Sequence, residues 1–208
     1  MTLTLFESIQ QIVREEVGRM RTAELATVQK QHAHSSSGDS DNYACTVVLR
    51  DSGIVLARVP VATERIGSAS IPAVGELVLV QFLNGDINAP VIVGRLYNDA
   101  DRPPPNDDGQ AILHLPLGAS DDQAVHVELH SDTRKAIVKL GSALALTVQD
   151  DDPVVKLDVA GGQATVKIGK DGSITIESQT SLSIKGGSDV KIEAAGQLTL
   201  KGATVNIN

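Results

Sequence analysis

The sequence predicts an all-β protein with one N-terminal helix, and three observations lead to this prediction. Apolar residues make up 41% of the 208 residues, yet only 2% are aromatic. Nearly all of these apolar residues are valine, isoleucine, leucine and alanine, which suits a pleated sheet better than a globule with a lined pocket. Short apolar runs alternate with turn residues in the first half of the chain, and an eight-residue repeat occupies its end.

Composition also limits the partners and the location of the chain. A net charge of -8 argues against nucleic acid, because phosphate binding depends on lysine and arginine. Cys45 is the single cysteine, so no disulfide forms within the chain and a buried thiol is expected. No apolar run approaches the roughly 20 residues of a membrane helix, and the acidic start does not resemble a signal peptide. We expect a soluble chain that is made in the cytoplasm.

Residues 1–22 are predicted to form an amphipathic helix. Thr4 and Glu7 have the spacing of a capping box. Apolar residues then recur at three- and four-residue steps on one side: Phe6, Ile9, Val13, Val17 and Met20. This stripe is compatible with packing on its own domain and with docking on another protein, and the sequence leaves both open.

Residues 23–98 are predicted to form a small closed barrel. Five strands are expected, at Leu25–Gln31, Tyr43–Arg50, Ile54–Val61, Glu76–Leu83 and Pro90–Leu96. Asp51–Gly53 and Asn84-Gly85 supply turn signals between them. Five short strands in about 75 residues are typical of a Greek-key barrel of the OB type. Because a basic groove with stacking aromatics is missing from this segment, a structural collar is favoured over single-strand binding.

Residues 99–125 are predicted to be a proline-rich linker and transition, because three consecutive prolines with flanking acids form a stiff, solvated connection. Residues 126–208 follow as a repetitive β segment. Its first strands are expected at Val125–Leu129, Ala136–Leu140, Leu144–Val148 and Val154–Val159.

The repeat begins at Val166 and consists of apolar–polar–apolar triplets. Their first residues step by eight from 166 to 198, and a last triplet follows after seven residues. The inward-facing residues of these triplets form the predicted trimer core: Val166, Ile168, Ile174, Ile176, Leu182, Ile184, Val190, Ile192, Leu198, Leu200, Val205 and Ile207.

The eight-residue period favours a triple-stranded β-helix, or β-prism, formed by a homotrimer. Eight residues are too few to close one coil of a single-chain solenoid, whereas three chains supply 24 residues per turn. Two alternative arrangements are less favourable. One chain that wraps three triplets per coil leaves fewer than two coils, and a flat antiparallel meander exposes its apolar face to water. The prism predicts interleaved strands that pair with other chains.

The order of barrel, proline-rich joint and octad prism resembles the central spike of contractile injection machines, the phage baseplate assembly protein V family. The most specific motifs lie in the barrel, at residues 72–86 (PAVGELVLVQFLNGD) and 88–98 (NAPVIVGRLYN). The resemblance implies a structural spike without enzymatic activity that closes a tail tube and punctures the target envelope. It would be made in the bacterial cytoplasm and assembled into a virion tail or an extracellular injection particle. A trimeric receptor- or glycan-binding fibre is the alternative function.

The resemblance also implies partners. The large hub domain that precedes the barrel in type VI relatives is missing from this sequence, so a separate hub protein is expected to dock on Phe6, Ile9, Val13 and Val17. The metal-binding His-x-His of some phage spikes is missing from the last residues. A separate tip protein similar to PAAR-repeat proteins is therefore expected to dock on Thr204, Val205, Asn206, Ile207 and Asn208. Contact with the target membrane would be transient.

No catalytic site, metal site or cofactor is predicted from the residues. His32 and His34 share one strand face but flank a flexible loop, where exposed histidines are ordinary. His126 and His130 are four residues apart on one strand face, and solvent exposure is expected for both. The run Asp150–Asp152 is interpreted as a solvated turn. The chain lacks a nucleophile elbow and a glycine-rich phosphate loop.

Overall fold

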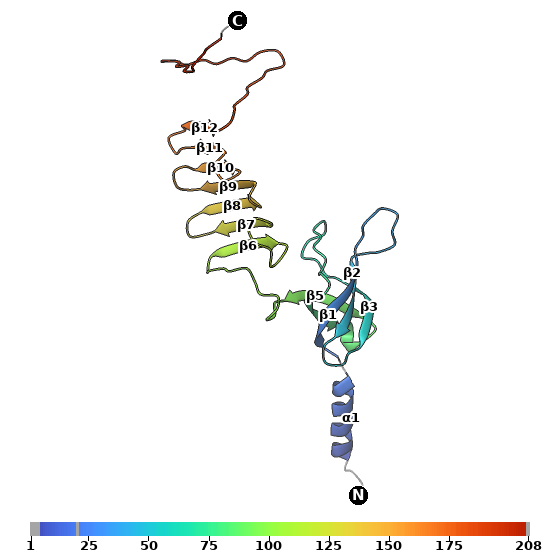
Figure 1. Ribbon diagram of the computed structural model, residues 1–208. Coiled ribbons are helices and arrows are strands. Elements are labelled where there is room, and N and C mark those ends of the chain that lie inside the picture. Colours follow the sequence, from blue (N-terminus) through green and yellow to red (C-terminus); the bar gives the residue numbers. More distant parts are fainter. Residues whose placement is uncertain (1–4, 20, 207–208) are drawn as a thin grey trace. The chain divides into compact units, whose positions relative to one another are not determined.

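The structure is a computed structural model that describes residues 5–19 and 21–206 (Figure 1). It divides into two compact units, Met1–Pro103 and Pro104–Asn208. The first unit begins with helix α1, Leu5–Arg19, as the apolar stripe predicts. The predicted cap Thr4 and the last stripe residue Met20 lie outside the described residues. No helix in the described part of the chain is long and apolar enough to span a bilayer.

Five strands of the first unit form a barrel (Figure 1): β1 Ala23–His32, β2 Ala44–Leu49, β3 Val55–Pro60, β4 Leu77–Phe82 and β5 Pro90–Leu96. They confirm the five predicted strands. The strands pair antiparallel in the order β3-β2-β1-β4-β5. The two outer strands meet where Val61 bridges Ile92 in parallel, and the Ala62 amide donates to the Ile92 carbonyl at 2.8 Å. This contact closes the sheet, which is the strand arrangement of an OB barrel.

The barrel is filled by small aliphatic side chains around one aromatic ring, Phe82. Its buried core consists of Ala26, Val28, Cys45, Val47, Leu49, Val59, Val78, Val80, Phe82 and Ile92. The Cys45 thiol is fully buried, as predicted, and burial raises its pKa. The predicted turns are confirmed as well, since Gly53, Asn84 and Gly85 all have positive φ angles. Three of the four strand pairings in this sheet contain a register shift.

The loop between β1 and β2 is organised by Asp39. Its carboxylate accepts hydrogen bonds from the backbone amides of Ser35 at 2.7 Å and Ser36 at 2.9 Å. It also contacts His34 Nδ1 at 2.9 Å. The hydrogen bond from the Ser36 amide is the largest cause that holds the pKa of Asp39 well below its usual value. The loop is therefore ordered by a charged acceptor at its centre.

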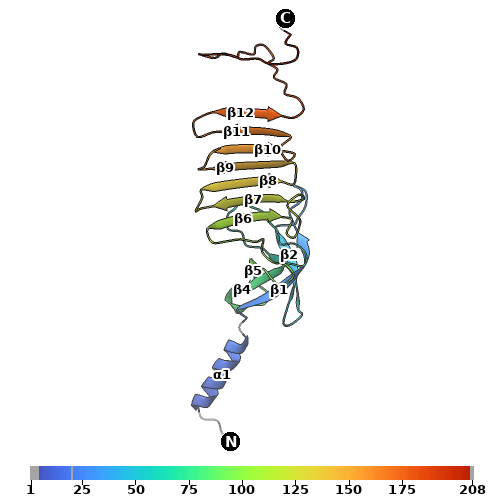
Figure 2. The same cartoon turned by 60° about the vertical axis from the view of Figure 1, so that its left-hand side comes forward.

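The second unit is one seven-stranded sheet in which each strand pairs antiparallel with the next (Figure 2). Its strands are β6 Gln110–Leu115, β7 Val125–His130, β8 Lys135–Leu140, β9 Leu144–Gln149, β10 Val155–Val159, β11 Ala164–Ile168 and β12 Ile174–Ser178. The four strands predicted ahead of the repeat are confirmed as β7 to β10. No pairing in this described sheet contains a register shift.

Strand β6 lies inside the range 99–125, which was predicted to be a proline-rich linker and transition. Its register is fixed by six residue pairs with β7, from Gln110 opposite His130 to Leu115 opposite Val125. The loop 116–124 that joins the two strands is anchored by a hydrogen bond from the Gly141 amide to the Ala124 carbonyl. The loop also passes close to Gly141, where an added Cβ would lie 2.6 Å from the Asp122 carbonyl oxygen.

The predicted interleaving of strands from different chains is wrong for the first two triplets. Val166 and Ile176 lie opposite each other in β11 and β12 of the same chain. The turn around Gly172, with φ +82, allows this hairpin because eight residues suffice for a short strand and a tight return. The strands predicted at 182–184, 190–192 and 198–200 are not formed, and residues 179–206 contain no strand. A three-residue triplet has too few ladder bonds to hold a strand without a neighbouring edge.

Candidate assembly surface

The second sheet has one polar and one apolar face. Because side chains alternate along a strand and the pairing is unbroken, residues opposite each other share a face across all seven strands. We call one side the apolar face. It carries Ala111, Leu113, Leu115, Val125, Val127, Leu129, Ala136, Val138, Leu140, Leu144, Leu146, Val148, Val155, Leu157, Val159, Ala164, Val166, Ile168, Ile174 and Ile176.

The apolar face is only half shielded in the single chain. Eight of its large side chains are between 43% and 67% exposed: Leu113, Leu115, Val125, Leu129, Leu140, Val148, Ile174 and Ile176. Residues on it shield one another within the sheet, and the described strands of the second unit form this single sheet without a second layer of their own to cover it. A contiguous apolar patch of this extent marks an interaction surface.

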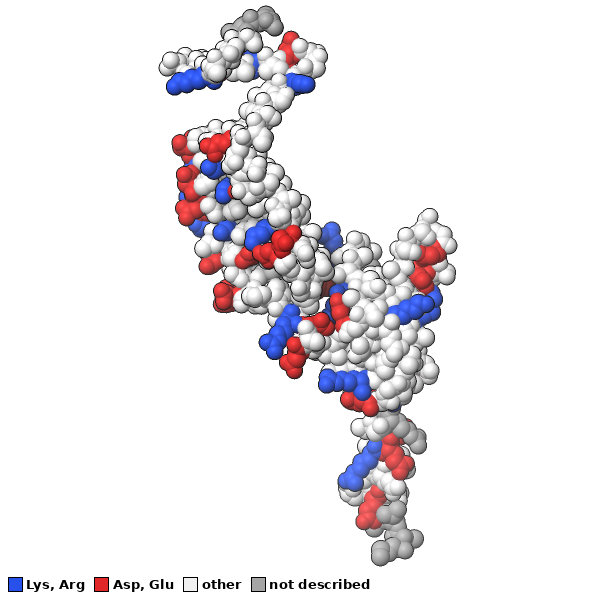
Figure 3. All heavy atoms as spheres, in the orientation of Figure 1, with Lys and Arg blue, Asp and Glu red and all other residues white. Residues whose placement is uncertain are grey.

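The opposite face is polar and carries charges of both signs. Lys156 pairs with Asp158 at 3.2 Å, and Lys167 pairs with Glu177 at 3.5 Å. In Figure 3, acidic and basic side chains gather along one margin of the β8–β12 region, and the broad area beside them is free of both. The polar face is therefore suited to contact with solvent, whereas the apolar face is suited to burial.

The predicted trimer-core residues fall into two groups. Val166, Ile168, Ile174 and Ile176 lie together on the apolar face. The others are outside any strand, and the large ones among them are more than half exposed: Leu182, Ile184, Val190, Ile192, Leu198, Leu200 and Val205. Ile207 lies outside the described residues. The structure thus brings together only the first two triplets.

The residues predicted to dock partners are exposed. Phe6, Ile9, Val13 and Val17 are 51% to 68% exposed along one side of α1. Ile12, on the flank of that stripe, is 60% exposed; it stands three residues after Ile9 but is absent from the predicted docking residues. At the other end, Thr204, Val205 and Asn206 are exposed, whereas Ile207 and Asn208 lie outside the described residues.

Of the paired histidines at the barrel edge, His34 is exposed as expected, but the expected exposure of His32 is wrong because its side chain is buried. His32 Nε2 contacts Thr46 Oγ1 at 2.9 Å, while His34 contacts Asp39, so the two imidazoles have separate partners. Asp150 pairs with Arg134, and an Asp152 oxygen accepts the Lys170 amide at 2.9 Å. Asp150 is therefore paired with cations from neighbouring turns, and Asp152 accepts a backbone amide.

The expected exposure of His126 and His130 is wrong. Their side chains are 11% and 17% exposed, and both approach the Glu128 carboxylate between them. His126 Nε2 lies 3.2 Å from Glu128 Oε2. His130 Nε2 lies 2.7 Å from Oε1 but is not aligned for a hydrogen bond. Neighbouring strands cover these rings, and the sequence of β7 alone does not show which residues those strands supply.

Residues 50–97 match the family model described as the type VI secretion system/phage-baseplate injector OB domain. The match covers strands β3 to β5 and most of the motif at residues 72–98. No curated protein matches the chain. The matched family is a structural baseplate and injector domain, which supports a baseplate-associated role and assembly into a virion or injection particle. Residues 50–97 of the barrel are therefore similar to this family of injector OB domains, in agreement with the resemblance that the sequence motifs indicate.

Proposed function

We propose that three copies of the chain form the central spike of a contractile tail or injection machine. The spike closes the tail tube below a separate hub protein and punctures the target envelope without enzymatic activity. The observation that carries the proposal is the apolar face of β6–β12, which leaves large aliphatic side chains exposed across seven strands. The injector OB domain at residues 50–97 supplies the baseplate context.

Three sheets arranged as the sides of a triangular prism would bury this face. Each chain contributes one side, the three apolar faces meet along the axis, and the polar faces remain in water. This arrangement retains the strand pairing within each chain. In the predicted interleaved prism, by contrast, neighbouring strands come from different chains. Two sheets packed face to face are the alternative, but they provide no closed cross-section for the triplets of residues 179–206.

The triplets in residues 179–206 have the same apolar–polar–apolar pattern as β11 and β12. Leu182, Ile192 and Leu200 repeat the spacing of the triplets in β11 and β12 but lack a strand neighbour in the single chain. Neighbouring chains would supply the missing edges, so residues 179–206 would become ordered strands on assembly. The exposed stripe of α1 would bind the hub protein, and residues 204–208 would bind a tip protein.

Light scattering on the purified full chain tests the assembly. The expected mass is about 65 kDa, three times the chain mass of 21.8 kDa. A monomer or a dimer at micromolar concentration would exclude the prism.

A second experiment tests the tip. Deletion of residues 203–208 is expected to abolish co-purification of a co-expressed tip protein and to leave the trimer intact. Full retention of the tip protein would exclude this docking surface.

A further inference from the structure

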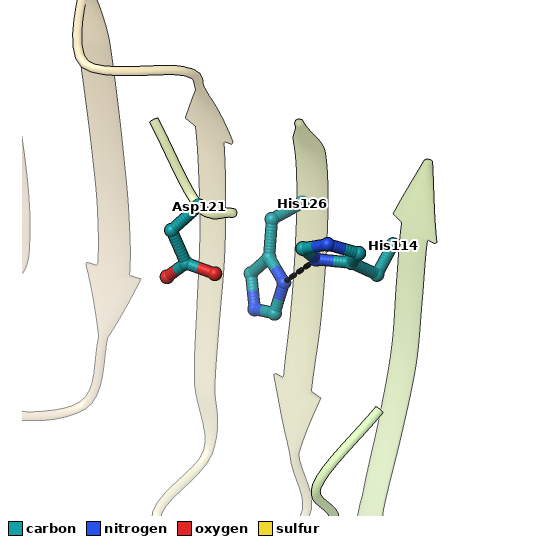
Figure 4. Close-up of side chains that lie close together, drawn as sticks. All are labelled: His114, Asp121 and His126. Carbon is teal, nitrogen blue, oxygen red and sulfur yellow. Dashed lines mark hydrogen bonds between the residues drawn. The ribbon is translucent and has the colours of Figure 1, made fainter. Parts of the chain in front are cut away.

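We propose that His114, Asp121 and His126 form a binding site for a divalent transition-metal ion, best suited to Zn²⁺, on the polar face of the second sheet. One ligand atom from each residue lies within 4.8 Å of those of the other two. Figure 4 shows the three side chains converging from β6, from the β6–β7 loop and from β7. The site is independent of trimer assembly, because it lies on the face opposite the apolar one.

The two imidazoles face each other through the same type of nitrogen. His114 Nδ1 lies 3.1 Å from His126 Nδ1, and the rings cross at 74° without stacking. Two nitrogens bound to one tetrahedral zinc ion at 2.0–2.1 Å are about 3.3 Å apart. The two Nδ1 atoms therefore already have nearly the spacing that a shared metal ion imposes.

The hydrogen-bond partners of the two Nε2 atoms determine that the lone pairs of both rings lie on the Nδ1 atoms, which face each other. His114 Nε2 lies 2.8 Å from the Ala119 carbonyl oxygen, which only accepts, so Nε2 carries the hydrogen. His126 Nε2 lies 3.2 Å from the Glu128 carboxylate, which accepts in the same way. In the neutral rings both Nδ1 atoms are then bare. Metal-binding histidines are commonly oriented by such acceptors.

Two bare nitrogens at 3.1 Å repel each other unless a cation lies between them. A shared proton or a metal ion would remove the repulsion. The third group favours the metal, because the Asp121 carboxylate points toward the His126 ring (Figure 4) and adds a negative oxygen ligand. Two nitrogens and one carboxylate oxygen are a donor set that zinc accepts.

The surroundings allow an ion to enter and water to complete its coordination. The Asp121 side chain is 60% exposed, whereas that of His126 is 11% exposed. Lys139 Nζ holds Asp121 Oδ2 at 3.0 Å and would compete with the metal. A bound ion would fasten the β6–β7 loop to both strands that it connects.

Titration of the full chain, without a histidine tag, with Co²⁺ and Zn²⁺ tests the site. We expect one ion per chain and the intense visible absorption of tetrahedral Co²⁺, which Zn²⁺ displaces. His114→Gln should abolish this absorption, and His34→Gln, which removes an exposed histidine of the barrel, should leave it unchanged. Glu128→Gln should weaken binding about 10- to 100-fold, because it removes the charge that orients His126.

Lys139→Met separates metal binding from folding, because it removes the competing cation and keeps all three ligands. Tighter binding in this variant supports the site. Absence of binding by the wild-type chain would overturn the proposal. Equal binding by His114→Gln, or equal loss in His34→Gln, would also overturn it.

Discussion

Ile176→Asp is the most direct test of the apolar face. Ile176 lies on β12 opposite Val166 and is 55% exposed in the single chain. Full burial of an isoleucine side chain is worth about 1.5–3 kcal/mol, so roughly 1 kcal/mol per chain remains to be gained on assembly. Three chains lose about 3 kcal/mol in the variant, which alone weakens the trimer about 100-fold. Three unpaired carboxylates in the core add several kcal/mol to this cost.

Thr175→Asp is the matched control, because it adds the same charge to the neighbouring residue on the polar face. Light scattering over a dilution series measures the dissociation of both variants, and circular dichroism checks that the sheet persists. We expect Ile176→Asp to be monomeric at concentrations where Thr175→Asp remains trimeric. Equal dissociation of the two variants would refute the assignment of the faces.

Three further predictions concern other parts of the chain. Val13→Asp on the exposed stripe of α1 should abolish co-purification of a hub protein, and Gln11→Asp on the opposite side should not; equal retention would exclude docking through this stripe. Gly141→Ala should lower the free energy of unfolding by about 1–3 kcal/mol more than Gly118→Ala, because both have positive φ but only Gly141 lacks space for a Cβ. Equal denaturation midpoints would contradict this contact.

The third of these concerns acid. The pKa of Asp39 is lowered in the folded loop, so its stabilising contribution is complete above the usual aspartate value near 4 and is lost as the pH falls toward the folded value. Protection of the two serine amides that donate to Asp39 should therefore decline only in strong acid. Asp39→Asn should remove this dependence, and an unchanged profile in that variant would contradict the assignment.

Strand positions were largely predictable from the sequence, whereas strand neighbours were not. Strand β5 begins at Pro90, contains Gly94 and ends directly before Tyr97. The predicted bounds of β5 therefore agree with the structure. The octad fixes which residues share a face, and Val166 and Ile176 do share one. It does not specify whether the neighbouring strand comes from the same chain, because a hairpin and an interleaved prism have the same alternation. Strand β6 was missed because Ile112 obscures the alternation of Ala111, Leu113 and Leu115.

For the residues of the proposed metal site, too, the sequence of one strand predicts which residues share a face but not which residues of the next strand lie opposite them. His126 and His130 were recognised as sharing one strand face. The partner of His126 is His114, which lies opposite it only through the register of β6 and β7. A register of this kind depends on the loop of nine residues between Leu115 and Val125, and such a loop does not reveal its geometry in the sequence.

The unbroken register of β6–β12 also restricts how the length of this segment can change. One residue inserted within a strand would turn the following side chains to the wrong face, whereas residues added in a turn leave the faces intact. Whole hairpins can be added or removed without altering either surface, and each strand adds about 4.8 Å in the stacking direction. The length of this segment in the stacking direction therefore changes in discrete steps, when whole hairpins are duplicated or deleted.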